Sequence, residues 1–266
     1  MKIHHHFSRI AHKYQDLRTT DQEPILFIKD KLQNLPKIEA ADVGCGGGRY
    51  DIELFHHLGD KLWLTCIDHN KNMLDELIKN LKEHEIKNFK AIKAPAGDLP
   101  LPTNSLDCMF TFNAMHHFKL LDFLKEASRV LRDNGYLFIY TRLRSQNKRN
   151  IWGRYFPKFN EKENRLYELN ELEDMLKKIP VLKLESVEHF KYNRITELKW
   201  LVTQAKNCHY STFYLYDEKE FKEALKEFQE NIVRHFKNLD RITWEDENIM
   251  LVIRETIKGN EIQIQR

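Results

Sequence analysis

Four glycines fall within five residues of this chain, at Gly44, Gly46, Gly47 and Gly48. An apolar run from Ile38 to Val43 precedes them, and a helix-like pattern starts at Tyr50. Glycine allows positive φ angles and lets the backbone approach a ligand closely. The free N–H groups at the start of a helix can bind ligand oxygens. The stretch therefore predicts a strand, a turn and a helix that bind a nucleotide-type cofactor. The alternative is a tight turn that binds nothing.

The next apolar run, from Lys61 to Ile67, predicts a second strand that ends at Asp68. An acidic residue about 20 residues beyond the glycines is where dinucleotide-binding sheets hold a ribose. A carboxylate can accept hydrogen bonds from two neighbouring hydroxyls, whereas it would repel a phosphate. The alternative role for Asp68 is an N-cap of the following helix, and the two roles are compatible.

Composition limits the class of protein. The 266 residues suffice for one large domain, or for a domain with a cap, and the formal net charge of +3 neither favours nor excludes nucleic acid. The four cysteines form no Cys-x-x-Cys pair, so neither a zinc site nor a disulfide framework is expected. We expect no bound metal, no membrane span and a reducing, cytoplasmic location.

Predicted helices and strands alternate along the first half of the chain. Helices are expected at 69–85 and 120–131, and further strands at 89–94, 106–113 and 136–141. This alternation predicts a parallel, doubly wound sheet with right-handed crossovers. Ligands bind such sheets outside the carboxyl ends of the strands. In the turn at 133–135, we expect Gly135 to take the positive φ.

Two further stretches complete a pattern with the glycine loop. Residues 94–107 are Ala-Pro-Ala-Gly-Asp-Leu-Pro-Leu-Pro-Thr-Asn-Ser-Leu-Asp, and residues 110–118 are Phe-Thr-Phe-Asn-Ala-Met-His-His-Phe. Together these motifs resemble the class I S-adenosylmethionine-dependent methyltransferases, most closely the ubiquinone- and menaquinone-biosynthesis group. The resemblance extends from Phe7 to Arg142. It implies a Rossmann-like, mostly parallel seven-stranded sheet, S-adenosyl-L-methionine as cofactor and S-adenosyl-L-homocysteine as product.

The resemblance also implies which residues bind the cofactor. The glycine loop would pass against it, Asp68 would hold its ribose, and Asp42 would orient the loop or meet its ammonium group. The opening segment would fold over the cofactor, or would be a surface helix with one packed aromatic residue. The whole implied set is Tyr14, Arg18, Asp42, Gly44, Cys45, Gly46, Gly48, Asp68, His69, Ala96, Gly97, Asn113 and Met115.

One position departs from the family pattern. The family usually has an acidic residue before the alanine of its third motif, and this residue accepts a hydrogen bond from the adenine amino group. Pro95 stands at that place here. Either backbone atoms around Ala96 and Gly97 make the adenine contact, or Asp98 substitutes.

The second half of the chain has a different character. Residues 142–158 interleave basic and aromatic side chains, which predicts either a phosphate or nucleic-acid surface or a solvated loop packed onto the core. A helix is expected at 169–179, a sixth strand at 182–190, two helices at 194–205 and 217–236, and a seventh strand at 248–256. We therefore expect four parts: N-terminal helices with the cofactor-binding core at 1–142, a substrate-side segment at 143–192, a helical lid inserted between the last two strands at 193–240, and the last strand at 241–266.

Methyl transfer from a sulfonium is an in-line displacement, for which the protein aligns the reactants and excludes water. No enzyme nucleophile is needed. A general base, if one is used, is expected at His116 or His117, because histidine titrates near neutral pH. The alternative is that both are capping or packed histidines. The expected pocket for a small-molecule acceptor is lined by Trp152, Tyr155, His209 and Tyr210.

Other functions are compatible with parts of this pattern. A methyltransferase acting on RNA or protein would use the basic, aromatic stretch at 142–158. A non-catalytic cofactor-binding module or a nicotinamide dehydrogenase would share the glycine loop. The Leu99-Pro100 stretch and the His-His pair are not marks of a dehydrogenase, and no Tyr-x-x-x-Lys arrangement suited to hydride transfer is present.

Overall fold

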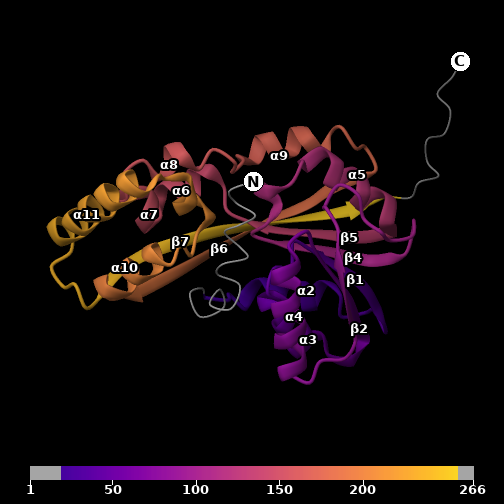
Figure 1. Cartoon of the computed structure of the whole chain (residues 1–266). Helices are drawn as coiled ribbons and strands as arrows, with labels where there is room; N and C mark the ends of the chain where they lie inside the picture. The colour runs from indigo at the N-terminus through magenta and orange to yellow at the C-terminus, as the bar shows by residue number, and fades with distance from the viewer. Residues whose placement is uncertain (1–18, 257–266) are drawn as a thin grey trace, which may run out of the picture. The chain divides into compact units, whose positions relative to one another are not determined.

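The computed structural model describes residues 19–256 (Figure 1). The chain forms two compact units, which are described separately. Of the described residues, the core unit contains 21–141, 169–188 and 250–256, and the second unit contains 19–20, 142–168 and 189–249. The predicted cofactor residues Tyr14 and Arg18 lie outside the described residues.

One seven-stranded sheet has the order β3-β2-β1-β4-β5-β7-β6. Its first five strands are β1 (Ile38–Val43), β2 (Leu62–Asp68), β3 (Phe89–Lys93), β4 (Leu106–Phe112) and β5 (Leu131–Thr141). Each neighbouring pair among these five strands is parallel. The predicted doubly wound, mostly parallel seven-stranded sheet is therefore confirmed.

The burial of these strands agrees with their positions in the sheet. β1, β2 and β4 lie inside the sheet and are buried along almost their whole length, as strands covered on both faces should be. The edge strand β3 is only partly buried. Aromatic side chains pack across the parallel strands; the rings of Phe110 and Phe138, for example, stack with centroids 5.8 Å apart.

Helices cover both faces of the sheet in the core unit (Figure 1). They are α2 (Glu23–Lys31), α3 (Arg49–Leu58), α4 (Lys71–Glu83), α5 (Leu120–Val130) and α9 (Leu169–Leu176), with short 3₁₀ turns η2 (Gly59–Lys61) and η3 (Met115–His117). α2 contacts α3, α4 contacts β2 and β3, and α5 contacts β5 and α9. As the sequence predicts, Pro24 lies in the first turn of α2, where its missing N–H costs no hydrogen bond.

The second unit is mostly helical. It contains α6 (Arg144–Arg149), α7 (Ile151–Tyr155), α8 (Phe159–Lys162), α10 (Leu198–Lys206), η4 (Ser211–Leu215) and α11 (Glu218–His235). The predicted insertion of helices between the last two strands is present as α10, η4 and α11. The proposal that residues 193–240 act as a lid stays a prediction.

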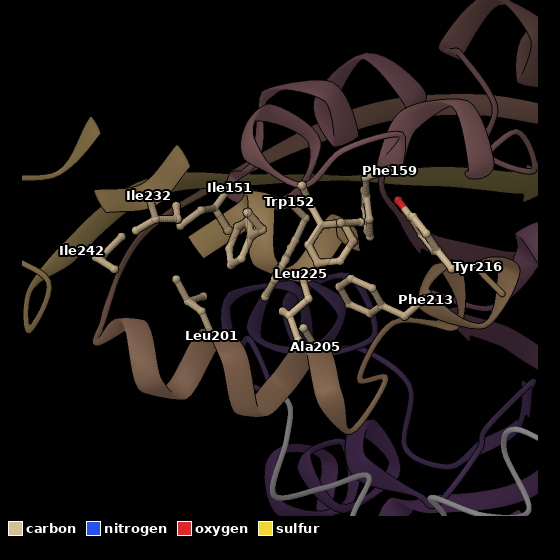
Figure 2. Packing of buried hydrophobic residues seen from close by; sticks show 13 residues of the cluster. Ile151, Trp152, Phe159, Leu201, Ala205, Phe213, Tyr216, Leu225, Ile232 and Ile242 are labelled. Carbon is tan, nitrogen blue, oxygen red and sulfur yellow. The ribbon is translucent and has the colours of Figure 1, made fainter. Parts of the chain in front are cut away.

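The second unit has its own aromatic core. Figure 2 shows Trp152 of α7 among Phe159 of α8, Leu201 of α10, Phe213 of η4 and Leu225 of α11. The Trp152 ring stacks on Phe228 at 5.1 Å between centroids and meets Phe213 edge-on at 5.3 Å. Such offset and edge-on contacts are the favoured arrangements of aromatic rings.

Several predicted boundaries are wrong. Residues 144–155 form two short helices instead of a loop. β6 (Leu182–Thr196) and β7 (Ile242–Glu255) are longer than expected, and α10 starts four residues later than predicted. The polar residues that alternate with Ile242 and Trp244 obscured the strand pattern, although period-two alternation is typical of a strand. β6 and β7 each contribute residues to both units.

The turn at 133–135 also differs from the prediction. Asn134, with φ of 63°, takes the left-handed conformation instead of Gly135. Asparagine tolerates this region better than most residues with a side chain. Gly135 is needed for space instead, because a Cβ there would lie 2.9 Å from the carbonyl oxygen of Arg132. No helix among residues 19–256 is both long and apolar enough to span a membrane.

Candidate functional site

The glycine loop joins β1 to α3 and is pressed against the end of β4. Gly44, Gly46 and Gly48 have φ of 79°, 57° and 83°, which side-chain-bearing residues rarely adopt. The amide groups of Gly44 and Cys45 both donate to the carbonyl of Ile67, at 2.7 and 3.2 Å. A Cβ at Gly44 would lie 2.5 Å from Cβ of Ala114. This backbone requires glycine, for conformation and for space.

Asp68, the last residue of β2, is tied to this loop. Its Oδ2 accepts from the amide of Gly46 at 3.0 Å, and its Oδ1 accepts from the amide of Asn70 at 2.8 Å. Each carboxylate oxygen can accept a second hydrogen bond. Burial raises the pKa of Asp68, and the bonds from Asn70 and Gly46 with the nearby His69 partly offset that rise.

The helix cap after β2 is a different residue. Oδ1 of Asn70 accepts from the amides of Asn72 and Met73 at 3.0 and 3.4 Å, so Asn70 is the N-cap of α4. The alternative role of Asp68 as that N-cap is therefore wrong. Asp68 instead links the end of β2 to the glycine loop and to the amide of Asn70.

Asp42 lies beneath the loop and not on its surface. It is 2% exposed, and Asp51 of α3 is fully buried. Burial and the neighbouring Asp51 raise the pKa of Asp42 well above its usual range. Burial raises the pKa of Asp51 to about 6, against hydrogen bonds from Asp42 and Cys66 that lower it. The buried thiol of Cys45 also has a raised pKa, which makes it a packed group and not a reactive one.

The residues after β3 and β4 reach the same edge of the sheet, because β1 to β4 are parallel neighbours. Ala96 and Gly97 form the centre of a turn closed by the amide of Asp98, which donates to the carbonyl of Pro95 at 3.2 Å. Asn113, with φ of 53°, ends β4 and donates its amide to the carbonyl of Tyr140 at 2.8 Å.

The His-His pair follows Asn113 in η3. The rings of His116 and His117 lie 4.1 Å apart between centroids, and both side chains are half-buried. Met115 beside them is buried. Of the predicted cofactor residues in the core unit, His69 and Gly97 are exposed. The imidazole of His69 is 42% exposed, and its Nδ1 lies 3.6 Å from Oδ1 of Asp68.

The four predicted acceptor residues lie in the second unit. Trp152 and His209 are buried in its aromatic core, with ring centroids 5.0 Å apart. Tyr210 is half-buried, and its hydroxyl accepts from Nη1 of Arg142 at 3.3 Å. Tyr155 is half-buried against His235 and Phe236 of the same unit.

Three of the six basic residues at 142–158 form ion pairs within the second unit. Arg142 is buried and donates to Asp246 at 2.5 Å, and Arg149 forms an ion pair with Glu247. Lys158 pairs with Glu220 at 3.3 Å.

Two groups of supporting residues escaped the sequence analysis. Asn80 of α4 is buried and donates from Nδ2 to the carbonyl of Gly47 at 2.9 Å, which supports the loop from behind. In the sequence, the signal for this role was a polar amide, that of Asn80, within the apolar face of α4. Arg129 and Glu126 of α5 hold the Leu99–Leu101 segment through hydrogen bonds to its backbone.

These features fit an adenosyl cofactor. Glycine conformations bring the backbone of the loop to the surface of the site, and a carboxylate with spare acceptor capacity stands one strand away. Carboxylates in this position suit the two hydroxyls of a ribose.

Comparison with known proteins agrees with this geometry. Residues 41–139 match the family model of the methyltransferase domain. The demethylmenaquinone methyltransferase of a Geobacillus strain is 28% identical over 140 residues, which are 50% of this chain and 60% of that protein. The Staphylococcus aureus enzyme of the same name is 29% identical over 140 residues, 50% of this chain and 57% of its own. The chain thus spans less than two thirds of the length of these relatives.

Solved structures share the fold. The YcgJ protein of Bacillus subtilis superposes with a TM-score of 0.63 at 14% identity, covering 89% of this chain and 100% of its own. The [4+2]-cyclase SpnF superposes with a TM-score of 0.57 at 15% identity, covering 89% of this chain and 81% of its own. A cyclase among the neighbours illustrates that the fold by itself does not define the reaction.

The fold, the glycine loop and the family match together identify residues 41–139 as a class I S-adenosylmethionine-dependent methyltransferase domain. Residues 41–139 are a methyltransferase domain that is similar in sequence to the demethylmenaquinone methyltransferases, and S-adenosylmethionine is the cofactor of this class of domain.

Proposed function

We propose that this protein transfers a methyl group from S-adenosylmethionine to a small-molecule acceptor. The observation that carries the proposal is the link between Asp68 and Gly46, because one carboxylate both holds the glycine loop and offers acceptors for a ribose. The names of the matched relatives direct the search for the acceptor to demethylmenaquinone and related quinones.

The proposal gives roles to several residues that follow the carboxyl ends of the parallel strands. Asp68 accepts from the ribose hydroxyls, and the loop from Gly44 to Gly48 lets the cofactor lie against bare backbone. The cofactor supplies an activated methyl group and a good leaving group. The chain orients it and excludes water, with Asn113 and Met115 at the end of β4.

A proton must leave some acceptors, for example a hydroxyl. His116 or His117 is the proposed base, because both are half-buried histidines that follow β4 and histidine as a residue type titrates near neutral pH. An acceptor that loses no proton before transfer would not require them.

The binding half of the proposal is tested by calorimetry. The native protein should bind S-adenosylhomocysteine and should not bind NAD. Asp68→Asn should weaken the binding of S-adenosylhomocysteine by about tenfold or more, since a carboxylate accepts stronger hydrogen bonds than an amide does. The matched control is Asp75→Asn on the exposed surface of α4, which should bind as the native protein does.

The catalytic half is tested with labelled S-adenosylmethionine and a demethylmenaquinone of short side chain. Transfer of label to the quinone supports the proposal. Binding of NAD in place of S-adenosylhomocysteine, or native affinity in the Asp68→Asn protein, would contradict it. Transfer to RNA with a steep salt dependence would replace the small-molecule assignment, because phosphate contacts give such a slope.

A further inference from the structure

Two carboxyl side chains lie directly behind the glycine loop. Asp42, near the end of β1, is 2% exposed, and Asp51, in the first turn of α3, is fully buried. A Cβ at Gly48 would lie 3.7 Å from Oδ2 of Asp51, which is ordinary van der Waals contact. The Asp51 carboxyl therefore lies beneath the same backbone that the proposed cofactor would rest on.

These two carboxyls lack the hydrogen-bond donors that buried carboxylates usually have. Among residues 19–256, no backbone amide, side-chain N–H or alcohol donates to Oδ1 of Asp42 or to either oxygen of Asp51. The carboxyl of Asp42, when protonated, and the thiol of Cys66 are the groups that donate to Asp51. Asp68, in contrast, accepts two backbone amides. A negative charge on Asp51 is therefore poorly compensated by its own surroundings.

The titratable groups that face the pair add no positive charge. They are Asp42 of β1, Cys66 and Asp68 of β2, and Cys45 of the loop. His69 is the one cationic candidate nearby, and its charge acts on Asp68. No charged group of α2 or α4 alters the pKa of either carboxyl of the pair. A cation that came to lie on the loop would therefore be attracted to Asp51.

Asp51 acquires its charge in the physiological range of pH. Burial raises its pKa to about 6, so the ionised fraction of its carboxyl increases between pH 5 and pH 7. Burial and the neighbouring Asp51 hold the pKa of Asp42 well above its usual range. Adjacent carboxyls titrate as a pair, and in this pair the first negative charge resides on Asp51.

The substrate and product forms of the cofactor differ in one charge. S-adenosylmethionine has a sulfonium, an ammonium and a carboxylate, so its net charge is +1, whereas S-adenosylhomocysteine has a neutral thioether and no net charge. Their other groups are identical. A negative charge about 10 Å from the sulfonium, at an effective dielectric constant of about 20, changes affinity by about tenfold. Salt screens such a buried charge much less than an exposed one.

We propose that Asp51 makes the cofactor site selective for the positively charged S-adenosylmethionine over the uncharged S-adenosylhomocysteine. This inference rests on the proposed function, because it adds a specificity-determining residue to the same cofactor site. Asp51 acts by charge from behind the glycine loop and makes no contact with the cofactor. Its attraction for the sulfonium favours the exchange of spent product for fresh cofactor.

The test is the ratio of two dissociation constants measured by calorimetry, that of S-adenosylhomocysteine divided by that of S-adenosylmethionine. At pH 7, Asp51→Leu should lower this ratio by about threefold or more. Leucine has a similar volume and gives Asp42 no donor, so the buried Asp42 stays neutral in the variant. The ratio does not depend on how much of the variant is folded, so loss of structure alone does not change it.

A second measurement needs no substitution. In the native protein, lowering the pH from 7 to 5 should reduce the ratio by about threefold or more, because Asp51 loses its charge. Asp68 and His69 also titrate near the loop, but they are unchanged in Asp51→Leu. The variant should therefore show a smaller dependence on pH than the native protein, and this difference isolates Asp51.

Asp75→Asn is the matched control, since it removes an exposed carboxylate of α4 that solvent and salt screen. It should keep the native ratio. An unchanged ratio in Asp51→Leu, an equal fall in Asp75→Asn, or a native ratio that is constant between pH 5 and pH 7 would each overturn the inference and leave the proposed function standing. Failure of the native protein to bind either compound would overturn the proposed function as well.

Discussion

Arg129 donates from Nη2 to the carbonyl oxygen of Leu99 at 2.8 Å, and this bond ties α5 to the segment that follows β3. A second bond runs from Nη1 to the carbonyl of Leu101 at 2.7 Å. Glu126 completes the arrangement by accepting the amide of Leu99 at 2.7 Å and by pairing with Arg129. One helical turn therefore holds the backbone of the segment that directly follows the turn from Pro95 to Asp98.

Replacing Arg129 should loosen this segment. Arg129→Met removes both donors to the carbonyls and leaves Glu126 without its ion pair. We expect the free energy of unfolding in urea to fall by about 1–3 kcal/mol. Lys125→Met changes an exposed charge on the same helix and should stay within about 0.5 kcal/mol of the native protein. Equal effects of the two substitutions would contradict the role given to Arg129.

Gly44 and Gly46 separate two reasons for a glycine. Both have positive φ, 79° and 57°, so alanine costs about 1–2 kcal/mol of backbone strain at either position. At Gly44 a Cβ also meets Cβ of Ala114 at 2.5 Å, whereas at Gly46 the nearest atom is the end of the flexible Met73 side chain at 3.2 Å. In urea unfolding, Gly44→Ala should be more destabilising than Gly46→Ala by about 1–3 kcal/mol. A larger loss for Gly46→Ala would contradict the steric role given to Gly44.

The buried acid Asp51 should make stability depend on pH. Its pKa of about 6 exceeds its ordinary value of 3.8, so the folded state favours the protonated form. The stability this gives is present at low pH and is lost as the pH rises from about 4 through about 6. Asp51→Asn removes the charge that must otherwise be buried. We expect the variant to melt at a higher temperature than the native protein above about pH 7, and the difference to vanish near pH 4. A difference that does not change with pH would exclude this explanation.

Trp152 and Trp200 form a matched pair in the second unit. Trp152 is 3% exposed within the aromatic core, and Trp200 is 37% exposed on α10. Trp152→Ala should cost about 3–5 kcal/mol of unfolding free energy, because it leaves a cavity among packed rings. Trp200→Ala should cost less than about 1 kcal/mol. Circular dichroism during urea titration measures both. Comparable losses would mean that Trp200 has a packing role of its own.

The parts of the site that the sequence predicts are local or follow from strand order. The glycine loop and Asp68 lie at strand ends that any parallel, alternating arrangement brings to one edge. Glycine permits the positive φ of Gly44, Gly46 and Gly48 but does not by itself require it, because Gly135 does not adopt one.

What the sequence does not predict depends on partners far along the chain. Arg142 and Arg149 resemble solvent-facing charges until they are paired with Asp246 and Glu247, about a hundred residues later. That pairing accompanies short helices where a loop was expected. The role of Asn80 was likewise not predicted, because its partner is a single carbonyl at Gly47, 33 residues earlier.

The boundary between the two units falls inside β6 and β7, so neither unit is one continuous piece of chain. A gene fragment that encodes only residues 142–249 would carry residues 169–188 of the core unit with it. Replacing the second unit by that of a related protein would require junctions after Thr141, Glu168, Glu188 and Ile249, two of them within strands. Domain shuffling by simple recombination is therefore a poor route to new variants of this protein, and diversification by point substitution within the second unit is the more accessible one.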